Sequence, residues 1–319
     1  MITWLTRGSR DALNKLLQRQ TIHGTSVDVK ALGDKVDLLL SAGKVNEASI
    51  QAVRQSLDAL SCQIDMQQEA LETAVIKSGD AFQARMTTFV RKIEALERMS
   101  FRQHEALATL TRVLNTRHPF PTTRGWAASP DLLLFLYEFV LEKKPTVVVE
   151  LGGGLSSLVI AAALKTNGQG RLFSFDHDAE YAARTTTLLE REGFSDVAVI
   201  KYAPLSQWLP PTPSSLAVSW EWYTLPENLP AIDLLMVDGP PENTGSYSRY
   251  PALPALTDKL APNATVLLDD TIREAETKIA ETWRDEFGFD LVLRRDFEKG
   301  LAILGKLGAT HKAELASAV

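Results

Sequence analysis

The stretch TVVVELGGGLSSLVIAAAL, residues 146–164, decides the fold that the sequence predicts. Its β-branched start indicates a strand, the three glycines Gly152 to Gly154 indicate a tight turn, and the Ala- and Leu-rich second half indicates a helix. Glycine lets the chain reverse tightly and lets a ligand approach the backbone, while the first amides of the helix point toward that ligand. The stretch therefore predicts the start of a nucleotide site.

The glycine spacing argues against a nicotinamide or flavin dinucleotide. That fingerprint has glycine at its first, third and sixth places, and counted from Gly152 the sixth place holds Ser157. A strand, turn and helix without any ligand is the alternative, since such turns recur in α/β folds.

The composition is ordinary for a globular protein, with 45% hydrophobic and 23% charged residues in a chain of 319. A net charge of -6 gives no reason to expect a nucleic-acid partner. Cys62 is the only cysteine, which excludes intramolecular disulfides and fits a reducing compartment. The sequence contains neither a signal-peptide core nor a run of about 18 apolar residues. We expect a cytoplasmic protein without a membrane span.

A heptad pattern covers much of the N-terminal region, after a short expected helix that begins near Ser9. Apolar positions recur every seven residues from Val29 to Leu71, with a second set three residues further on. The register then steps by four, to Val75, Phe82, Phe89 and Leu96, as in a stutter. Residues 27–100 would span roughly 110 Å as one helix, too long to bury an apolar stripe alone. Two hypotheses remain open: a coiled coil that makes a homo-oligomer, and helices that fold back after a break at residues 43–46.

Composition divides the chain into four parts. We expect a helical region at 1–114, a linker or lid at 115–130, an α/β domain at 131–307 and a tail at 308–319. The linker is expected because its residues include three prolines and a glycine and show no periodicity. Within it, Trp126 either closes over a ligand or packs beside the next helix.

From residue 146 onward, strands and helices alternate, which is typical of a parallel sheet covered on both faces. The last two strands are joined at Glu298-Lys299-Gly300 and predict a closing antiparallel hairpin. The expected strands are 146–151, 171–175, 197–202, 232–238, one from 265, and the hairpin 289–297 with 301–307.

The segment ELGGGLSSL, residues 150–158, resembles the first motif of class I S-adenosylmethionine-dependent methyltransferases, an acid followed by GxGxG, with Ser156 at the third glycine. Five strand-helix units that end in a hairpin are also similar to that family. The resemblance covers about residues 125–307. It implies a Rossmann-like, mostly parallel seven-stranded methyltransferase sheet and S-adenosyl-L-methionine as cofactor.

Ligands of open parallel sheets bind at the carboxyl ends of the strands. Asp176 ends the second strand, at nearly the spacing after Glu150 that places a ribose-binding acid in Rossmann-like folds. The resemblance implies that Asp176 binds the adenosine ribose, with His177 a substitute or part of a helix cap. Ala203 stands where many similar enzymes carry an acid for adenine. The predicted cofactor-binding residues are Glu150, Gly152, Gly153, Gly154, Ser156, Ser157, Asp176, His177, Ala203, Asp238 and Trp126.

Three carboxylates lie at neighbouring strand ends: Asp238 after the fourth strand, and Asp269 and Asp270 after the fifth. Hard oxygen ligands suit Mg, Mn or Ca. VDG followed by LLDD resembles the divalent site of metal-dependent O-methyltransferases of the macrocin and catechol type, which often have Asn at the place of Asp270. A metal site at these three residues is therefore one hypothesis. A helix cap with a salt bridge to Arg249 or Arg273 is the other.

Methyl transfer to a hydroxyl needs a base, and a metal can lower the hydroxyl pKa. The predicted catalytic residues are Asp238, His118 and Tyr247. The polar loop after Asp238, GPPENTGSYSRYPALP, follows a strand end, where substrates are bound. The predicted substrate-binding residues are Arg249, Tyr250 and Trp222, the last in an aromatic insertion that either stacks on an acceptor or packs on the sheet.

The sequence thus predicts an S-adenosylmethionine-dependent methyltransferase that O-methylates a sugar or another small hydroxyl compound, with Mg or another divalent ion assisting. GWAASPD, VDGPP, SRYPALP and LLDD together resemble bacterial methyltransferases linked to surface-glycan or secondary-metabolite pathways. One alternative is metal-independent N- or O-methylation of a small acceptor. The other is a coiled-coil scaffold with a catalytically idle sheet domain.

Overall fold

The computed structural model describes residues 34, 38, 47–114, 116–123, 125, 127–211, 214–216 and 218–306. The predicted helix near Ser9, the first heptads, the break at 43–46, Trp126 and the tail at 308–319 lie outside these residues. The chain divides into two compact units, Met1–Lys92 and Ile93–Val319.

A single uninterrupted helix, α3 (Glu47–Leu114), contains 68 residues. Its predicted seam residues Ile64, Phe82 and Phe89 are exposed. The last turns of α3 are not exposed in this way, because Ala106, Leu110 and Leu114 are buried in the core of the second unit. One end of α3 is therefore part of the globular core. No helix in the described part of the chain combines the length and the apolar character needed to cross a membrane.

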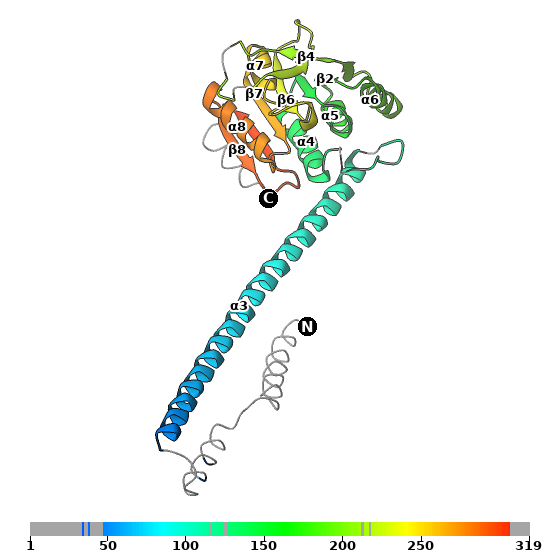
Figure 1. Cartoon of the computed structure of the whole chain (residues 1–319). Coiled ribbons are helices and arrows are strands. Elements are labelled where there is room, and N and C mark those ends of the chain that lie inside the picture. The colour runs from blue at the N-terminus through cyan, green and yellow to red at the C-terminus, as the bar shows by residue number, and fades with distance from the viewer. Residues whose placement is uncertain are drawn as a thin grey trace. The chain divides into compact units, whose positions relative to one another are not determined.

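The second unit is built on a seven-stranded sheet with the strand order β3-β2-β1-β6-β7-β9-β8 (Figure 1). The first five strands in this order are parallel, and β9 pairs antiparallel with both β7 and β8. This confirms the predicted Rossmann-like, mostly parallel seven-stranded sheet and its closing antiparallel hairpin. The strands are β1 (Val147–Leu151), β2 (Arg171–Asp176), β3 (Ala198–Tyr202), β6 (Ile232–Val237), β7 (Leu260–Asp269), β8 (Asp290–Arg294) and β9 (Leu301–Gly305).

Helices cover both faces of this sheet, as Figure 1 shows. Successive side chains of a strand point to opposite faces, so Val148 of β1 packs in one core cluster and Val149 in the other. Both strand residues are fully buried, which explains the continuous apolar runs in the sequence. The helices are α4 (Pro130–Lys143), α5 (Leu155–Asn167) and α6 (Ala179–Glu192) toward one cluster, and α7 (Ala252–Leu256) and α8 (Glu274–Phe287) toward the other.

Strand register brings the predicted site residues to one edge of the sheet. Leu151 of β1 is paired with Phe175 of β2 and with Val237 of β6, and Val237 is paired with Leu268 of β7. The residues that follow these positions are therefore neighbours along the carboxyl edge.

The aromatic insertion after β3 forms a second, two-stranded antiparallel sheet of β4 (Leu205–Trp208) and β5 (Trp220–Tyr223). The sequence did not predict these strands, because the prolines and irregular spacing of the insertion conceal any period-two pattern. The ring of Trp220 stacks on that of Tyr250, with 4.8 Å between centroids, and both residues are buried. The insertion thus packs on the sheet domain through its aromatic side chains.

Candidate active site

The glycine turn, residues 152–154, lies between β1 and α5 and is anchored to the neighbouring strand. Gly152 has φ +87, and its amide donates to Phe175 O at 2.9 Å. A Cβ at Gly152 would lie 2.9 Å from Gly239 N, and one at Gly153 would lie 2.6 Å from Ser174 Oγ. Only glycine allows the chain to fit at these two positions.

Glu150 lies fully buried beneath the turn. Ser174 Oγ donates to Glu150 Oε2 at 2.7 Å, and Ser157 Oγ donates to the same oxygen. Glu150 Oε1 is buried without a hydrogen-bond partner. Burial raises the pKa of Glu150, although hydrogen bonds from Ser156, Ser157 and Ser174 oppose this shift. Gly154 N also donates to Ser157 Oγ at 3.0 Å, so Ser157 connects the acid to the turn.

Asp176 ends β2 beside the turn. Its Oδ2 accepts from Gly153 N at 3.3 Å, and its Oδ1 accepts from Asp178 N at 2.9 Å. Asp178 caps α6, because its Oδ1 accepts from the amides of Glu180 and Tyr181. The two neighbouring acids thus differ: Asp176 faces the glycine turn, and Asp178 stabilises a helix.

A cavity of about 400 Å³ opens over the turn and Asp176. Tyr223 of β5 also lines this cavity; its hydroxyl is buried without a hydrogen-bond partner, and burial raises its pKa well above the usual value. The cavity offers glycine backbone, a carboxylate and phenol rings, which suit the ribose and base of a nucleoside. Its lining residues are Gly152, Gly153, Asp176, His177, Asp178, Tyr181, Tyr223, Asp238, Gly239, Pro241 and Asn243.

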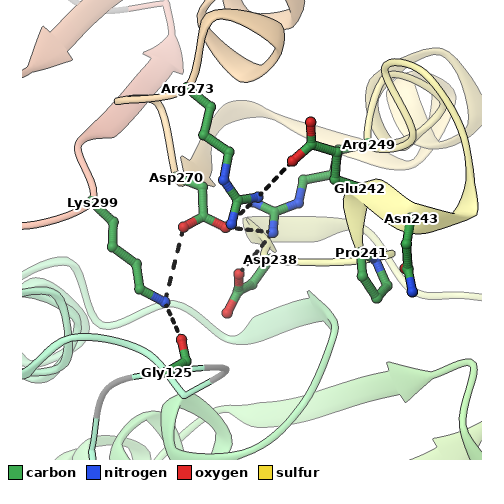
Figure 2. Close-up of a pocket in the computed structure, with 9 residues that line it drawn as sticks. All are labelled: Gly125, Asp238, Pro241, Glu242, Asn243, Arg249, Asp270, Arg273 and Lys299. Carbon is green, nitrogen blue, oxygen red and sulfur yellow. Dashed lines mark hydrogen bonds and ion pairs between the residues drawn. The ribbon is translucent and has the colours of Figure 1, made fainter.

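A second cavity of about 390 Å³ adjoins the first (Figure 2). Asp238, Pro241 and Asn243 line both cavities, so they form the boundary between them. The second cavity is polar and is lined by Gly125, Asp238, Pro241, Glu242, Asn243, Arg249, Asp270, Arg273 and Lys299.

Arg249 is buried between the carboxylates at the strand ends. Its Nη2 donates to Asp270 Oδ2 at 2.7 Å and to Asp238 Oδ1 at 3.2 Å, and its Nη1 donates to Asp269 O at 3.0 Å. Asp270 has φ +64, a left-handed conformation that Asp and Asn tolerate better than most residues. The structure therefore has the ion pair with Arg249 that the sequence offered as an alternative to a metal.

The carboxylates differ in their tendency to ionise. Burial raises the pKa of Asp238 to about 6, with Arg249 opposing the shift and Asp270 adding to it. Burial, then Asp238 and Asp270, raise the pKa of Asp269 well above its usual range. Burial lowers the pKa of Arg249, but the three aspartates more than offset this, so its guanidinium stays charged.

A divalent ion does not fit this arrangement of charges. The three carboxylates have oxygens within 4.8 Å of one another, which by itself suits an ion. However, Asp270 is already contacted by three cations: Arg249 at 2.7 Å, Arg273 Nη1 at 3.2 Å and Lys299 Nζ at 3.9 Å. Each of these cations would lie close to a divalent ion bound by Asp270 and would repel it.

The structure brings some of the predicted residues together and leaves others apart. His118 lies 2.9 Å from Glu192 at the end of α6, and Tyr247 lines a different cavity. Trp222 is buried in the core, and Ala203 is buried beside it. Tyr250 is buried as well and donates to Glu286 Oε2 at 2.6 Å. In the described part of the chain, these five residues are not in the lining of either of the two adjoining cavities. Ser156 and Gly154 line a smaller cavity of about 220 Å³ that also includes Asp238.

Several residues that line the two cavities were not among the predicted site residues, and three of them are instructive. Lys299 belongs to the turn between β8 and β9, and the pairing of Asp269 with Leu301 places it beside Asp270. The antiparallel hairpin was a signal that could have found it. Asn243 lies in the loop that was expected to bind substrate, but its own role had no signal. Tyr223 belongs to the aromatic insertion that was expected either to stack on an acceptor or to pack on the sheet, but its strand was not predicted and it was not chosen as a site residue.

Comparison with known proteins identifies one matching family model. Residues 149–271 match a model described as a methyltransferase domain. A search of curated proteins found no match.

Solved structures similar to the chain include three methyltransferases. An SAH-bound methyltransferase from Podospora anserina shares 14% identity, with a TM-score of 0.47, over 66% of this chain and 95% of that one. A methyltransferase from Geobacter sulfurreducens shares 18% identity, with a TM-score of 0.41, over 64% and 90%. The O-methyltransferase TomG from Streptomyces achromogenes, in complex with SAM, shares 14% identity, with a TM-score of 0.42, over 64% and 90%.

The matched stretch contains the glycine turn, Asp176 and the carboxylates at the strand ends, and the sheet around it has the predicted order with its antiparallel hairpin. Residues 149–271, at the centre of this sheet, are therefore similar to a methyltransferase domain.

Proposed function

We propose that the protein transfers a methyl group from S-adenosylmethionine to a hydroxyl of a small polar acceptor, without a divalent ion. One observation carries the proposal: two adjoining cavities share Asp238 at their boundary. A two-substrate transfer needs two compartments that meet at the reacting atoms.

The residues around the glycine turn fit the cofactor. The turn has no Cβ atoms where a ligand would approach, and Asp176 is oriented by the amides of Gly153 and Asp178. Asp176 can accept hydrogen bonds from the ribose hydroxyls, and Tyr223 offers a buried hydroxyl. Bound in this cavity, S-adenosylmethionine supplies an activated methyl group.

Asp238 is placed to accept the proton of the acceptor hydroxyl. Arg249 holds its Oδ1, and Figure 2 shows the other carboxylate oxygen pointing away from the guanidinium. S-adenosylmethionine bound in the first cavity would supply the methyl group to the acceptor oxygen and keep the carbon–sulfur electron pair, and Asp238 would take the hydroxyl proton. The carboxylate thus supplies the base, and its fixed orientation supplies the positioning.

The lining of the second cavity indicates the acceptor class. Its described residues include six charged side chains, three of each sign, and no aromatic ring: Asp238, Glu242, Asp270, Arg249, Arg273 and Lys299. A balanced set of donors and acceptors suits a neutral compound with several hydroxyls, such as a sugar of a surface glycan or of a secondary metabolite. An aromatic acceptor would find no stacking partner among these residues.

The test combines cofactor binding and turnover. Calorimetric titration with S-adenosylmethionine should give micromolar binding to the wild type, and Asp238→Asn should retain that binding. In a mass-spectrometric screen of hydroxylated acceptors, the wild type should add one methyl group and Asp238→Asn should add none. Asp258→Asn, which removes an exposed acid outside both cavities, serves as the matched control. No binding of S-adenosylmethionine to the folded wild type would reject the proposal.

We also propose that α3 assembles two copies of the chain as a parallel coiled coil. The stripe of Phe82, Met86, Phe89, Ile93 and Leu96 is exposed and follows the alternating spacing of four and three residues of a coiled-coil seam. Lys92 precedes the seam residue Ile93, and Glu97 follows the seam residue Leu96. In a parallel dimer these two positions of opposite charge face each other across the seam, which favours a second copy as the partner.

A further inference from the structure

The carboxylate pair of the proposed active site is joined by a cation that belongs to the chain. Arg249 Nη2 lies between Asp270 Oδ2 and Asp238 Oδ1, at 2.7 and 3.2 Å (Figure 2). Asp238 and Asp270 are two of the three carboxylates that a metal at this cluster would need. A planar guanidinium with several donors is suited to bridge two carboxylates in this way.

Arg249 is held in place by its neighbours in the chain. Ser248 Oγ donates to Pro240 O at 3.1 Å, and Tyr250 N donates to Tyr247 O at 2.9 Å. Trp283 Nε1 donates to Tyr250 O at 3.0 Å. The residues on both sides of Arg249 are buried, so the guanidinium cannot leave the carboxylates without displacing packed side chains.

Charge around the cluster is already balanced. Asp270 forms ion pairs with Arg249, Arg273 and Lys299. Arg249 also forms an ion pair with Asp238. A divalent ion placed among these oxygens would face three positive side chains at short range and would be repelled. If Arg249 lost its charge, the buried Asp270 and the half-buried Asp238 would lack their shared counter-ion, and a divalent ion would then be favoured.

We propose that the Arg249 guanidinium is the permanent cation of this site and keeps divalent ions out, so that the carboxylates bind a metal only when Arg249 is replaced. Arg249 is thus a positioning residue, which acts on the reaction through the orientation of Asp238. The inference deepens the proposed function and rests on it, but its test measures metal binding and involves no methyl transfer.

The experiment is a titration with Mn²⁺, followed by electron paramagnetic resonance of the free ion. The wild type should bind no Mn²⁺ with a dissociation constant below about 1 mM. Arg249→Met should gain one Mn²⁺ site, with a dissociation constant on the order of tenfold or more below the wild-type limit of about 1 mM. The double variant Arg249→Met/Asp270→Asn should lose this site. Arg284→Met removes the same charge from an exposed residue paired with Asp285 and should bind as weakly as the wild type.

Two results would overturn the inference. One is tight stoichiometric Mn²⁺ binding by the wild type that Asp270→Asn abolishes. The other is a folded Arg249 variant that binds Mn²⁺ no more tightly than the wild type, since the guanidinium would then not be what excludes the ion. If Arg249→Met does not fold, Arg249→Gln keeps an amide donor for one carboxylate and takes its place. Titration of the same samples with S-adenosylmethionine tests the proposed function separately.

Discussion

Gly152 lies against Gly239, so that a Cβ on Gly152 would come within 2.9 Å of the Gly239 amide nitrogen. The turn after β1 and the loop after β6 therefore touch through their backbones, at the boundary of the cofactor cavity.

Gly152→Ala should weaken both folding and cofactor binding. The alanine meets a backbone neighbour and adopts φ +87, and such strain costs about 1–3 kcal/mol. Thermal melts with and without S-adenosylmethionine measure both effects. Gly154 also has a positive φ, +155, but a Cβ added there would meet no atom within 4 Å. Gly154→Ala therefore measures the backbone strain without the steric contact. Equal losses in the two variants would show that the contact with Gly239 has no energetic effect.

Asp176 and Asp178 allow a direct comparison of binding with capping. Asp176→Ala should lower the affinity for S-adenosylmethionine by about tenfold or more, because two ribose hydroxyls lose a charged acceptor. Asp178→Ala should lower stability by about 1 kcal/mol, because it removes the cap of α6, and should lower the affinity less than Asp176→Ala, because the Asp178 side chain is bonded to the amides of Glu180 and Tyr181. Calorimetry and chemical denaturation separate these effects. Loss of affinity in Asp178→Ala alone would contradict the role given to Asp176.

The buried acid Glu150 should make folding pH-dependent. Its pKa is raised in the native state, so above pH 4.5 the native state binds more protons than the unfolded chain. The free energy of unfolding therefore falls as pH rises from 4.5 through the native pKa, and Glu150→Gln should remove that fall.

Asp233 provides a control of opposite sign. Burial would raise the pKa of Asp233, but hydrogen bonds from Thr146 and Val147 outweigh it, so the native pKa is lowered. Asp233 contributes stability that is present above pH 3.8 and is lost as pH falls through the native pKa. Asp233→Asn should reduce the fall in the free energy of unfolding at acidic pH. Urea titrations at several pH values check both variants, and parallel pH curves for wild type and Glu150→Gln would refute the first expectation.

The end of α3 should contribute to the stability of the methyltransferase domain. Leu110 is fully buried, and Leu110→Ala should cost about 2–5 kcal/mol. Val113, one turn away and exposed, should change stability by less than about 0.5 kcal/mol when replaced by Ala. Chemical denaturation measures both. Equal small effects would show that the packing of Leu110 contributes little.

The proposed dimer depends on the seam of α3. Phe82→Glu with Phe89→Glu should turn the protein into a monomer in sedimentation equilibrium, because four charges would be buried in the dimer. Met66→Glu is the matched control, since Met66 is equally exposed but lies off the seam. A wild type that sediments as a monomer would contradict the proposal outright.

The sequence predicted the sheet and the convergence of its strand ends well. Parallel strands carry their carboxyl ends at one edge, so Asp176, Asp238 and Asp269 had to be neighbours once the strands were recognised. Motif spacing and topology were sufficient for that part of the site.

The sequence offered a salt bridge to Arg249 or Arg273 as one of two hypotheses for these carboxylates, but it could not decide between that salt bridge and a metal. Arg249 reaches back to Asp238 and Asp270 only because the loop before it is folded by Ser248 and Tyr250, and those contacts leave no pattern in the sequence. Tyr250 and Trp222 were expected to bind substrate because aromatic residues in irregular segments often do. Here the same residues fill the core, a use that composition cannot distinguish.

The antiparallel pairing of β9 with β7 has a consequence for biosynthesis. Lys299 lies beside Asp270 because β9 pairs with β7, and both hairpin strands are translated after every parallel strand. A nascent chain that already has the glycine turn and all three aspartates still lacks one wall of the acceptor cavity. Completion of this cavity therefore depends on the last strands of the sheet to be translated.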